Sequence, residues 1–146
     1  MIINKEKHKK QNQQKIFLHS DTRNTYQRTK ILEYLQSVCT HPTAEQVYTT
    51  IKTQIPTITL ATVYRNLNIL AEQRKILRLE INKEFRYDAD ISMHQHCICN
   101  TCNTIIDLFD KEISLYALKK IKDSFSAQSV VVIFSGQCKK CWGDKK

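Results

Sequence analysis

The chain has 146 residues, of which 41% are hydrophobic and 25% are charged, and its formal net charge is +9. A compact chain of this length buries roughly 68–70% of its unfolded surface, so it can form a core without disulfides. Its longest apolar run has five residues, 130–134, whereas a membrane helix needs about 20. Because no apolar signal segment follows the N-terminus, we expect a cytoplasmic protein whose six cysteines are metal ligands or free thiols.

The positive charge is concentrated near the N-terminus. Residues 1–30 hold eight lysines and arginines against two acids, whereas residues 31–90 hold seven of each. The polar residues 1–15 either fray or begin a first helix that reaches about His19. A basic arm of this kind suits a polyanion, and DNA is the obvious candidate. The alternative is a solvated, lysine-rich tail.

Helical patterns follow the arm. Apolar residues recur at helical spacing from Thr25 to about Ser37. Thr43 and Gln46 have the spacing of a capping box, which predicts that the next helix begins there. Pro56 ends that helix, because proline cannot continue it.

A third helix is predicted after Thr59, with an apolar side made of Leu60, Val63, Leu67 and Leu70. Its opposite side carries Thr62, Tyr64, Arg65 and Asn68. Arginine commonly reads guanine, asparagine can read adenine, and a tyrosine ring can contact a thymine methyl or a phosphate. An ordinary polar helix surface has a similar composition, so both interpretations stay open on composition alone.

A β-hairpin is predicted next. Ile76–Ile81 alternates as a strand does, Asn82 and Lys83 supply the turn, and Glu84–Asp88 returns. Short helices followed by a hairpin are typical of a winged helix-turn-helix unit. In such a unit the last helix enters the major groove of DNA and the hairpin flanks it.

The C-terminal part has a different pattern. Short strands are predicted over 94–99 and 105–108, and an amphipathic helix over 111–125, with Ile113, Ala117, Leu118, Ile121 and Phe125 facing inward. A last strand over 129–135 is apolar on both faces, and both faces must therefore be covered. Because some 55 residues offer too little material for that, we expect a partner subunit.

Two Cys-x-x-Cys pairs carry the strongest local signal, Cys99/Cys102 and Cys138/Cys141. Four cysteines paired in this way supply the tetrahedral thiolates of structural zinc, which would join the C-terminus to the middle of the chain; disulfides are the weaker alternative. Cys97 extends the first pair to Cys-x-Cys-x2-Cys, which an iron–sulfur or copper site would also use, but we expect a buried free thiol. Cys39 is expected to pack.

Five motifs in order resemble the ferric uptake regulator (Fur) family of bacterial metal-dependent repressors. They are Arg23-Asn-Thr-Tyr-Gln-Arg-Thr-Lys-Ile-Leu32, His41-Pro-Thr-Ala-Glu-Gln-Val-Tyr48, Ala61-Thr-Val-Tyr-Arg-Asn-Leu67, Arg86-Tyr-Asp88 and His94-x-His96-x2-Cys99-x2-Cys102. The resemblance covers about residues 20–141. It implies an α+β chain with a winged-helix DNA-binding domain over 1–88 and a dimerisation and metal-binding domain over 89–146. It also implies a homodimer and a palindromic operator.

The resemblance assigns roles residue by residue. Cys99, Cys102, Cys138 and Cys141 match the structural zinc ligands, and Tyr64 and Arg65 match positions that touch DNA. The positions that match ligands of a regulatory ion are His41, Asp88, His94, His96 and Asp107. Three imidazoles and two carboxylates suit Fe(II), Mn(II) or Zn(II). His94 and His96 project from the same face of a strand, so both can meet one ion. Because His41 and Asp88 belong to the DNA-binding domain, one ion bound by all five ligands would tie the two domains together.

The aspartates at 88 and 107 resemble the peroxide-sensing (PerR) branch of the family. In that branch Fe(II) reacts with peroxide and an oxygen is added to a ligand histidine, at the positions of His41 and His94. Arg65 is instead typical of the iron-uptake branch. We therefore expect a peroxide-responsive repressor, with iron uptake control as the alternative and zinc or manganese control after it.

Two other classes are less well supported. A metalloenzyme would use His94, His96 and a carboxylate, but the sequence has no His-Glu-x-x-His pattern and no phosphate-binding glycine loop, so we expect no enzyme. A zinc-ribbon interaction module would leave the basic arm and the helix after Thr59 unexplained.

Overall fold

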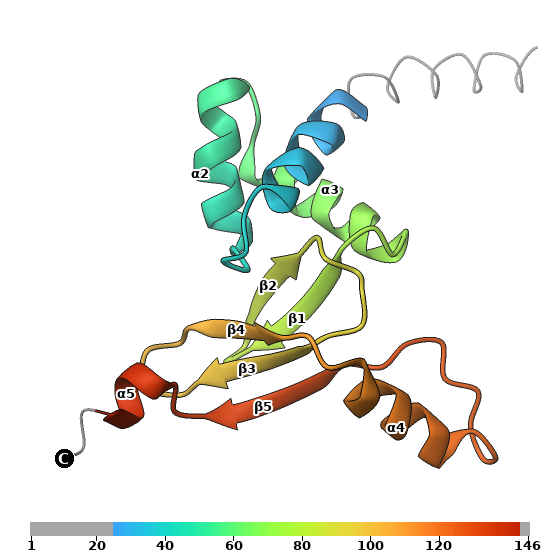
Figure 1. The fold of residues 1–146 in the computed structure, drawn as a ribbon. Helices are drawn as coiled ribbons and strands as arrows, with labels where there is room; N and C mark the ends of the chain where they lie inside the picture. The colour runs from blue at the N-terminus through green and yellow to red at the C-terminus, as the bar shows by residue number, and fades with distance from the viewer. Residues whose placement is uncertain (1–24, 144–146) are drawn as a thin grey trace, which may run out of the picture. The chain divides into compact units, whose positions relative to one another are not determined.

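The computed structural model describes residues 25–143 (Figure 1). The chain divides into two compact units, with the boundary between Ile91 and Ser92. The basic arm and the possible first helix, predicted over residues 1–19, lie outside the described residues. Within the described part, no helix has the length and apolar character that crossing a membrane requires.

The part of the first unit that the structure describes starts with three helices. Residues 25–36 are helical, α2 spans Ala44–Gln54 and α3 spans Leu60–Glu72. The predicted capping box is confirmed, because the Thr43 hydroxyl accepts from the Gln46 N–H at 3.3 Å and the Gln46 Oε1 accepts from the Thr43 N–H at 2.9 Å. Thr59 caps α3 in the same way, accepting from the Thr62 N–H.

The core of the first unit lies between these helices and the strands that follow. Its buried residues include Ile31, Leu35, Val47, Ile51, Val63, Leu67, Leu70 and Tyr87. Leu60, predicted on the inner side of α3, is only half-buried, whereas Asn66 is buried. Asn66 donates to the Thr62 carbonyl at 2.9 Å and accepts from Arg28 Nε at 3.3 Å. A buried amide with both groups bonded costs little, so it can replace an apolar residue there.

The predicted hairpin is present as β1 (Leu77–Ile81) and β2 (Glu84–Asp88), which pair antiparallel. Asn82 and Lys83 have φ values of 53° and 66°, as a tight two-residue hairpin turn of type I′ requires. The Tyr87 N–H donates to the Pro42 carbonyl at 3.1 Å, which ties β2 to the start of α2. Three helices and this hairpin form a winged helix-turn-helix unit.

The second unit is a three-stranded sheet with two helices. β3 (Gln95–Cys99) lies in the middle, antiparallel to β4 (Ile105–Leu108) and parallel to β5 (Val132–Gly136). α4 (Lys111–Ile121) connects the outer strands, and α5 (Lys139–Gly143) follows β5. The buried Gln95 amide donates to the Asp110 carbonyl and to Ser114 Oγ, both at 2.8 Å, and so fastens the central strand to α4.

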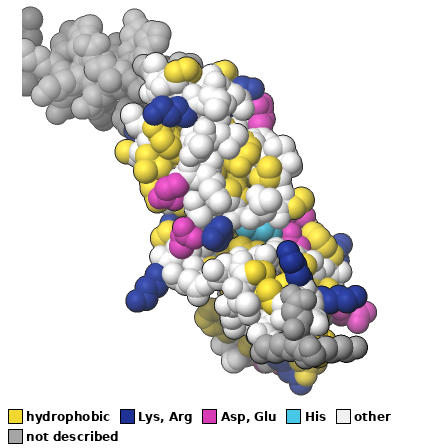
Figure 2. All heavy atoms as spheres, turned by 90° about the vertical axis from the view of Figure 1, so that its left-hand side faces the viewer, with side chains coloured by type: hydrophobic (Ala, Val, Ile, Leu, Met, Phe, Trp, Pro, Cys, Tyr) yellow, Lys and Arg dark blue, Asp and Glu magenta, His cyan; other side chains and the backbone are white. Residues whose placement is uncertain are grey.

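The predicted helix over 111–125 is too long by four residues, because α4 ends at Ile121 and a turn follows. Of its expected inner side, Ile113, Ala117 and Leu118 are half-buried, but Ile121 is 38% exposed and Phe125 is 66% exposed. Ile133 and Phe134, on opposite faces of β5, are exposed as well. The face drawn in Figure 2, which does not show α4, has hydrophobic side chains scattered among polar and charged ones. A single copy of this unit therefore leaves apolar surface that water solvates poorly.

Candidate metal centres and DNA-reading face

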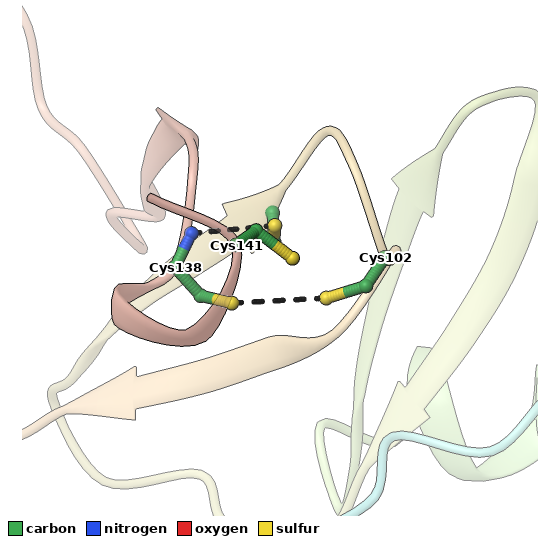
Figure 3. A group of neighbouring side chains, drawn as sticks. Cys102, Cys138 and Cys141 are labelled. Atoms are coloured by element: carbon green, nitrogen blue, oxygen red, sulfur yellow. Dashed lines mark hydrogen bonds between the residues drawn. The ribbon is translucent and has the colours of Figure 1, made fainter. Parts of the chain in front are cut away.

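Four cysteine sulfurs gather at one end of the second unit (Figure 3). Cys99 ends β3, Cys102 lies in the turn after it, Cys138 precedes α5 and Cys141 lies within it. The four Sγ atoms all lie within 4.8 Å of one another, and Cys102 Sγ is 3.8 Å from Cys138 Sγ. Four sulfurs at about 2.3 Å from one zinc stand about 3.8 Å apart, so this spacing fits a tetrahedral zinc site.

Hydrogen bonds affect the thiols of this cluster differently. The N–H of Cys138 donates to Cys99 Sγ at 3.3 Å, and this bond, with that of the Cys102 backbone, lowers the pKa of Cys99 to about 5. Hydrogen bonding with Thr104 lowers the pKa of Cys102. The thiols of Cys102 and Cys138 instead raise the pKa of Cys141 to about 12. All four are free cysteines, so the weaker alternative of disulfides is not found among them.

The remaining two thiols differ from expectation. Cys39, expected to pack, is exposed, because it lies in the bend that follows the first described helix and no element covers it. Cys97, expected to be buried, is half-buried, since the sheet face that it shares with Ile106 and Phe134 is open. Neither belongs to the group of four sulfurs.

A buried imidazole and a carboxylate lie together in the first unit. His41 precedes α2 with a φ of 49°, and Asp88 ends β2. The hydrogen bond between Pro42 and Tyr87 joins the two segments next to these residues. As a result His41 Nε2 lies 3.4 Å from Asp88 Oδ2, and both side chains are nearly inaccessible to water.

Two buried imidazoles and a carboxylate lie together in the second unit. His94 Nε2 lies 3.0 Å from His96 Nε2, and Asp107 Oδ1 lies 3.8 Å from His96 Nε2 and 4.0 Å from His94 Nε2. The register of the sheet explains this placement, because His96 is paired with Asp107 across β3 and β4. Three potential ligand atoms thus converge within coordination range of a small cation.

Some side chains of the predicted DNA-reading face of α3 are exposed, and some already form hydrogen bonds with other residues of the protein. Tyr64 and Arg65 are exposed, and Thr62 is bonded to the cap residue Thr59 at 2.9 Å. Tyr64 donates to Glu45 Oε1 at 2.6 Å, a bond that raises the pKa of Tyr64 to about 12 and lowers that of Glu45. Asn68 Oδ1 accepts from Arg78 Nη1 at 3.1 Å.

Glu45 and Arg78 are the residues of this face that sequence reasoning missed. Glu45 lies in the first turn of α2, which packs against α3, and Arg78 lies in β1 and reaches α3 through its bond to Asn68. Only the folded chain brings these two residues to the helix. The one available sequence signal is the outward position of Arg78 in an alternating strand, between the apolar Leu77 and Leu79.

Comparison with known proteins agrees with this architecture. The model of the ferric uptake regulator family matches residues 19–134. The peroxide-responsive repressor PerR of Staphylococcus aureus (strain USA300) is 31% identical over 119 residues, which cover 80% of each chain. The peroxide operon regulator of Bacillus subtilis is 38% identical over 84 residues, or 57% of this chain and 58% of that protein.

Solved structures give the same result. The peroxide stress regulator of Campylobacter jejuni superposes with a TM-score of 0.76 at 32% identity, covering 87% of this chain and 97% of that one. The ferric uptake regulator Fur of Helicobacter pylori, described as having three functional metal binding sites, has a TM-score of 0.71 at 26% identity, with 90% and 93% covered. A family match over most of the chain and this agreement in fold lead to one conclusion: the chain belongs to the ferric uptake regulator family.

Proposed function

We propose that this chain is a metal-dependent transcriptional repressor of the PerR type, which acts on operator DNA in the cytoplasm and is released by peroxide. The winged helix-turn-helix unit supports the DNA-binding role. The likeness to peroxide-responsive regulators, in sequence and in fold, supports the peroxide response. Aspartate at both 88 and 107 also agrees with the PerR type.

The observation that carries the proposal is that each unit buries an incomplete set of metal ligands. His41 and Asp88 form one set, and His94, His96 and Asp107 form the other. Two ligands are too few for tight binding, and two histidines with one carboxylate can hold Fe(II) but leave coordination positions open, whereas five nitrogen and oxygen ligands suit Fe(II) or Mn(II) and hold it more completely. We infer that both sets complete one regulatory site, and that a bound Fe(II) supplies the reactivity toward peroxide.

The chain's own residues then set the response. Asp88 is buried and Asp107 is half-buried, and each lies beside an imidazole, so a shared cation neutralises charges that burial otherwise makes costly. Since the two sets belong to different units, binding favours the arrangement in which the units are joined. Shifting a population from 1:99 to 99:1 requires about 10⁴-fold tighter binding in that arrangement, or about 5.5 kcal/mol. Oxidation of His41 or His94 would remove a ligand and with it this preference.

The four-cysteine cluster is proposed to hold a structural Zn²⁺. Its spacing, and the N–H groups that favour the Cys99 thiolate, support this assignment. Such an ion would fasten α5 to the end of β3, in a unit whose own buried apolar core is small.

A homodimer is proposed on the apolar surface of the second unit. Phe125, Ile133 and Phe134 remain exposed in a single copy. A second copy would cover them, and two copies would present two reading helices to a palindromic operator.

Iron-responsive repression is the alternative function. Arg65 resembles the iron-uptake branch, and the Helicobacter pylori Fur structure has a similar fold. The two functions share the DNA-binding unit and both metal sites, and they differ in whether peroxide modifies the chain.

Loss of one zinc ligand should destabilise the second unit. Cys141→Ser should abolish bound zinc and the cooperative thermal unfolding of that unit, because structural zinc contributes about 10–16 kcal/mol in comparable small sites. Zinc content by mass spectrometry and calorimetry are the measurements. The control is Cys97→Ser, which removes a nearby thiol outside the cluster and should retain the zinc. A Cys141→Ser protein with one tightly held zinc and normal melting would refute the assignment.

Removal of a carboxylate from either unit should weaken the binding of the same metal ion. Asp88→Asn and Asp107→Asn should each reduce Mn(II) affinity by at least about tenfold while zinc is retained, because each removes one ligand from a single site. Asp123→Asn, an exposed aspartate beyond α4, serves as the control. Titration of zinc-loaded protein should give one Mn(II) per chain. Two Mn(II) per chain, with each variant losing a different one, would show two independent sites.

Peroxide should modify the chain only when iron is bound. After Fe(II) loading and exposure to micromolar peroxide, we expect one added oxygen on the peptides that contain His41 or His94, together with loss of DNA binding. Peptide mass spectrometry and a binding assay on the same sample measure both. Mn(II)-loaded protein is the control and should stay unmodified. Unmodified peptides with iron-dependent DNA binding would instead support the iron-responsive alternative.

A further inference from the structure

Asn68 and Arg78 form a linked pair where the reading helix meets the hairpin. Asn68 lies on α3 and Arg78 lies on β1. Arg78 Nη1 donates to Asn68 Oδ1 at 3.1 Å. A guanidinium has only donors, so the amide atom that faces it must be the oxygen. The orientation of the Asn68 amide is therefore determined by chemistry.

Arg78 is held from a second side by an aromatic ring. Its guanidinium carbon lies 4.8 Å from the centroid of the Phe85 ring, which comes from β2. A guanidinium stacks well on an aromatic face, and the stacking leaves its in-plane N–H groups available. In the described part of the chain, no carboxylate forms an ion pair with Arg78, so none of the described acids neutralises its positive charge.

This arrangement changes what Asn68 can recognise. Reading adenine requires the amide to donate to N7 and to accept from the N6 amino group. Here the Asn68 oxygen already accepts from a cation, and that cation would also oppose an approaching amino group. What remains for a ligand is the Asn68 NH₂ group, the free N–H groups of Arg78 and one positive charge.

We propose that Asn68 and Arg78 together bind one phosphate of the DNA backbone, and that Asn68 does not read adenine. Phosphate oxygens only accept and carry negative charge, so they match a group that only donates and is positive. The inference rests on the proposed function, since it concerns how the same helix binds operator DNA. Arg65 is exposed and forms no such bond with another described residue, and it stays available to read guanine.

The competing explanation is a purely structural link between α3 and the hairpin. Asn68→Asp separates the two explanations. A carboxylate at position 68 keeps the link to Arg78 and strengthens it with opposite charge, but it cancels the positive charge and removes the donors. A phosphate contact predicts that this variant binds DNA worst, and only a purely structural link is compatible with wild-type affinity.

The experiment uses the full chain loaded with zinc and Mn(II). A duplex selected from a random library by the wild-type protein, and a scrambled duplex of the same composition, are titrated at several salt concentrations. Asn68→Asp and Arg78→Ala should weaken binding to both duplexes by the same factor, about tenfold or more. The slope of log affinity against log salt should fall by about one.

Matched variants provide the controls. Lys119→Ala on α4 removes one positive charge from the second unit and should leave affinity unchanged. Arg65→Ala should reduce the preference for the selected duplex over the scrambled one. Melting temperatures of all variants are compared, so that a variant that unfolds is recognised, and Asn68→Ala then serves as a milder second test.

The outcomes are distinct. Wild-type affinity for Asn68→Asp, or an Asn68→Ala variant that loses discrimination at a single A·T pair while keeping its salt slope, would overturn the phosphate contact. A wild-type protein that binds no duplex with metal present would overturn the proposed function, and the phosphate contact with it.

Discussion

Carboxylates and imidazoles buried beside one another are the constraint on which the proposed mechanism depends. Burial penalises an ionised carboxylate unless a positive charge or several donors compensate it, and a bound cation is the most effective compensation. His41 and Asp88 create this requirement in the DNA-binding unit, and His94, His96 and Asp107 create it in the other. In the proposed repressor a single exchangeable ion compensates the carboxylates of both sets, so binding of that ion would favour the arrangement in which the two units are joined.

The two proposed metal ions differ in role because the ligands of one belong to a single unit, whereas the ligands of the other are divided between the two units. The four cysteines all belong to one small unit and approach one another within it, so a zinc bound there stabilises that unit without changing its relation to the other. The regulatory ligands are divided between the units by sequence. A metal ion that is released in response to a signal is therefore expected at the regulatory ligands, where the loss of one ligand would weaken the proposed connection between the two units.

Much of the fold was predictable because its signals are local. The capping box at Thr43, the end of α2 before Pro56 and the hairpin turn at Asn82 each depend on residues within a few positions, and all are confirmed. The thiolate cluster was equally readable from spacing. Other features could not be predicted from the sequence. They are the end of α4, the exposure of Cys39 and the bonds of Tyr64 and Asn68. Each of them depends on whether another element of the fold packs against that position.

The most direct measurement is anomalous diffraction at the manganese edge from crystals of the zinc-containing protein loaded with Mn(II). We expect one manganese peak per chain, within bonding distance of His41 and Asp88 and also of His94, His96 and Asp107. A peak bound only by the second unit's ligands, or separate peaks in the two units, would contradict a shared regulatory ion.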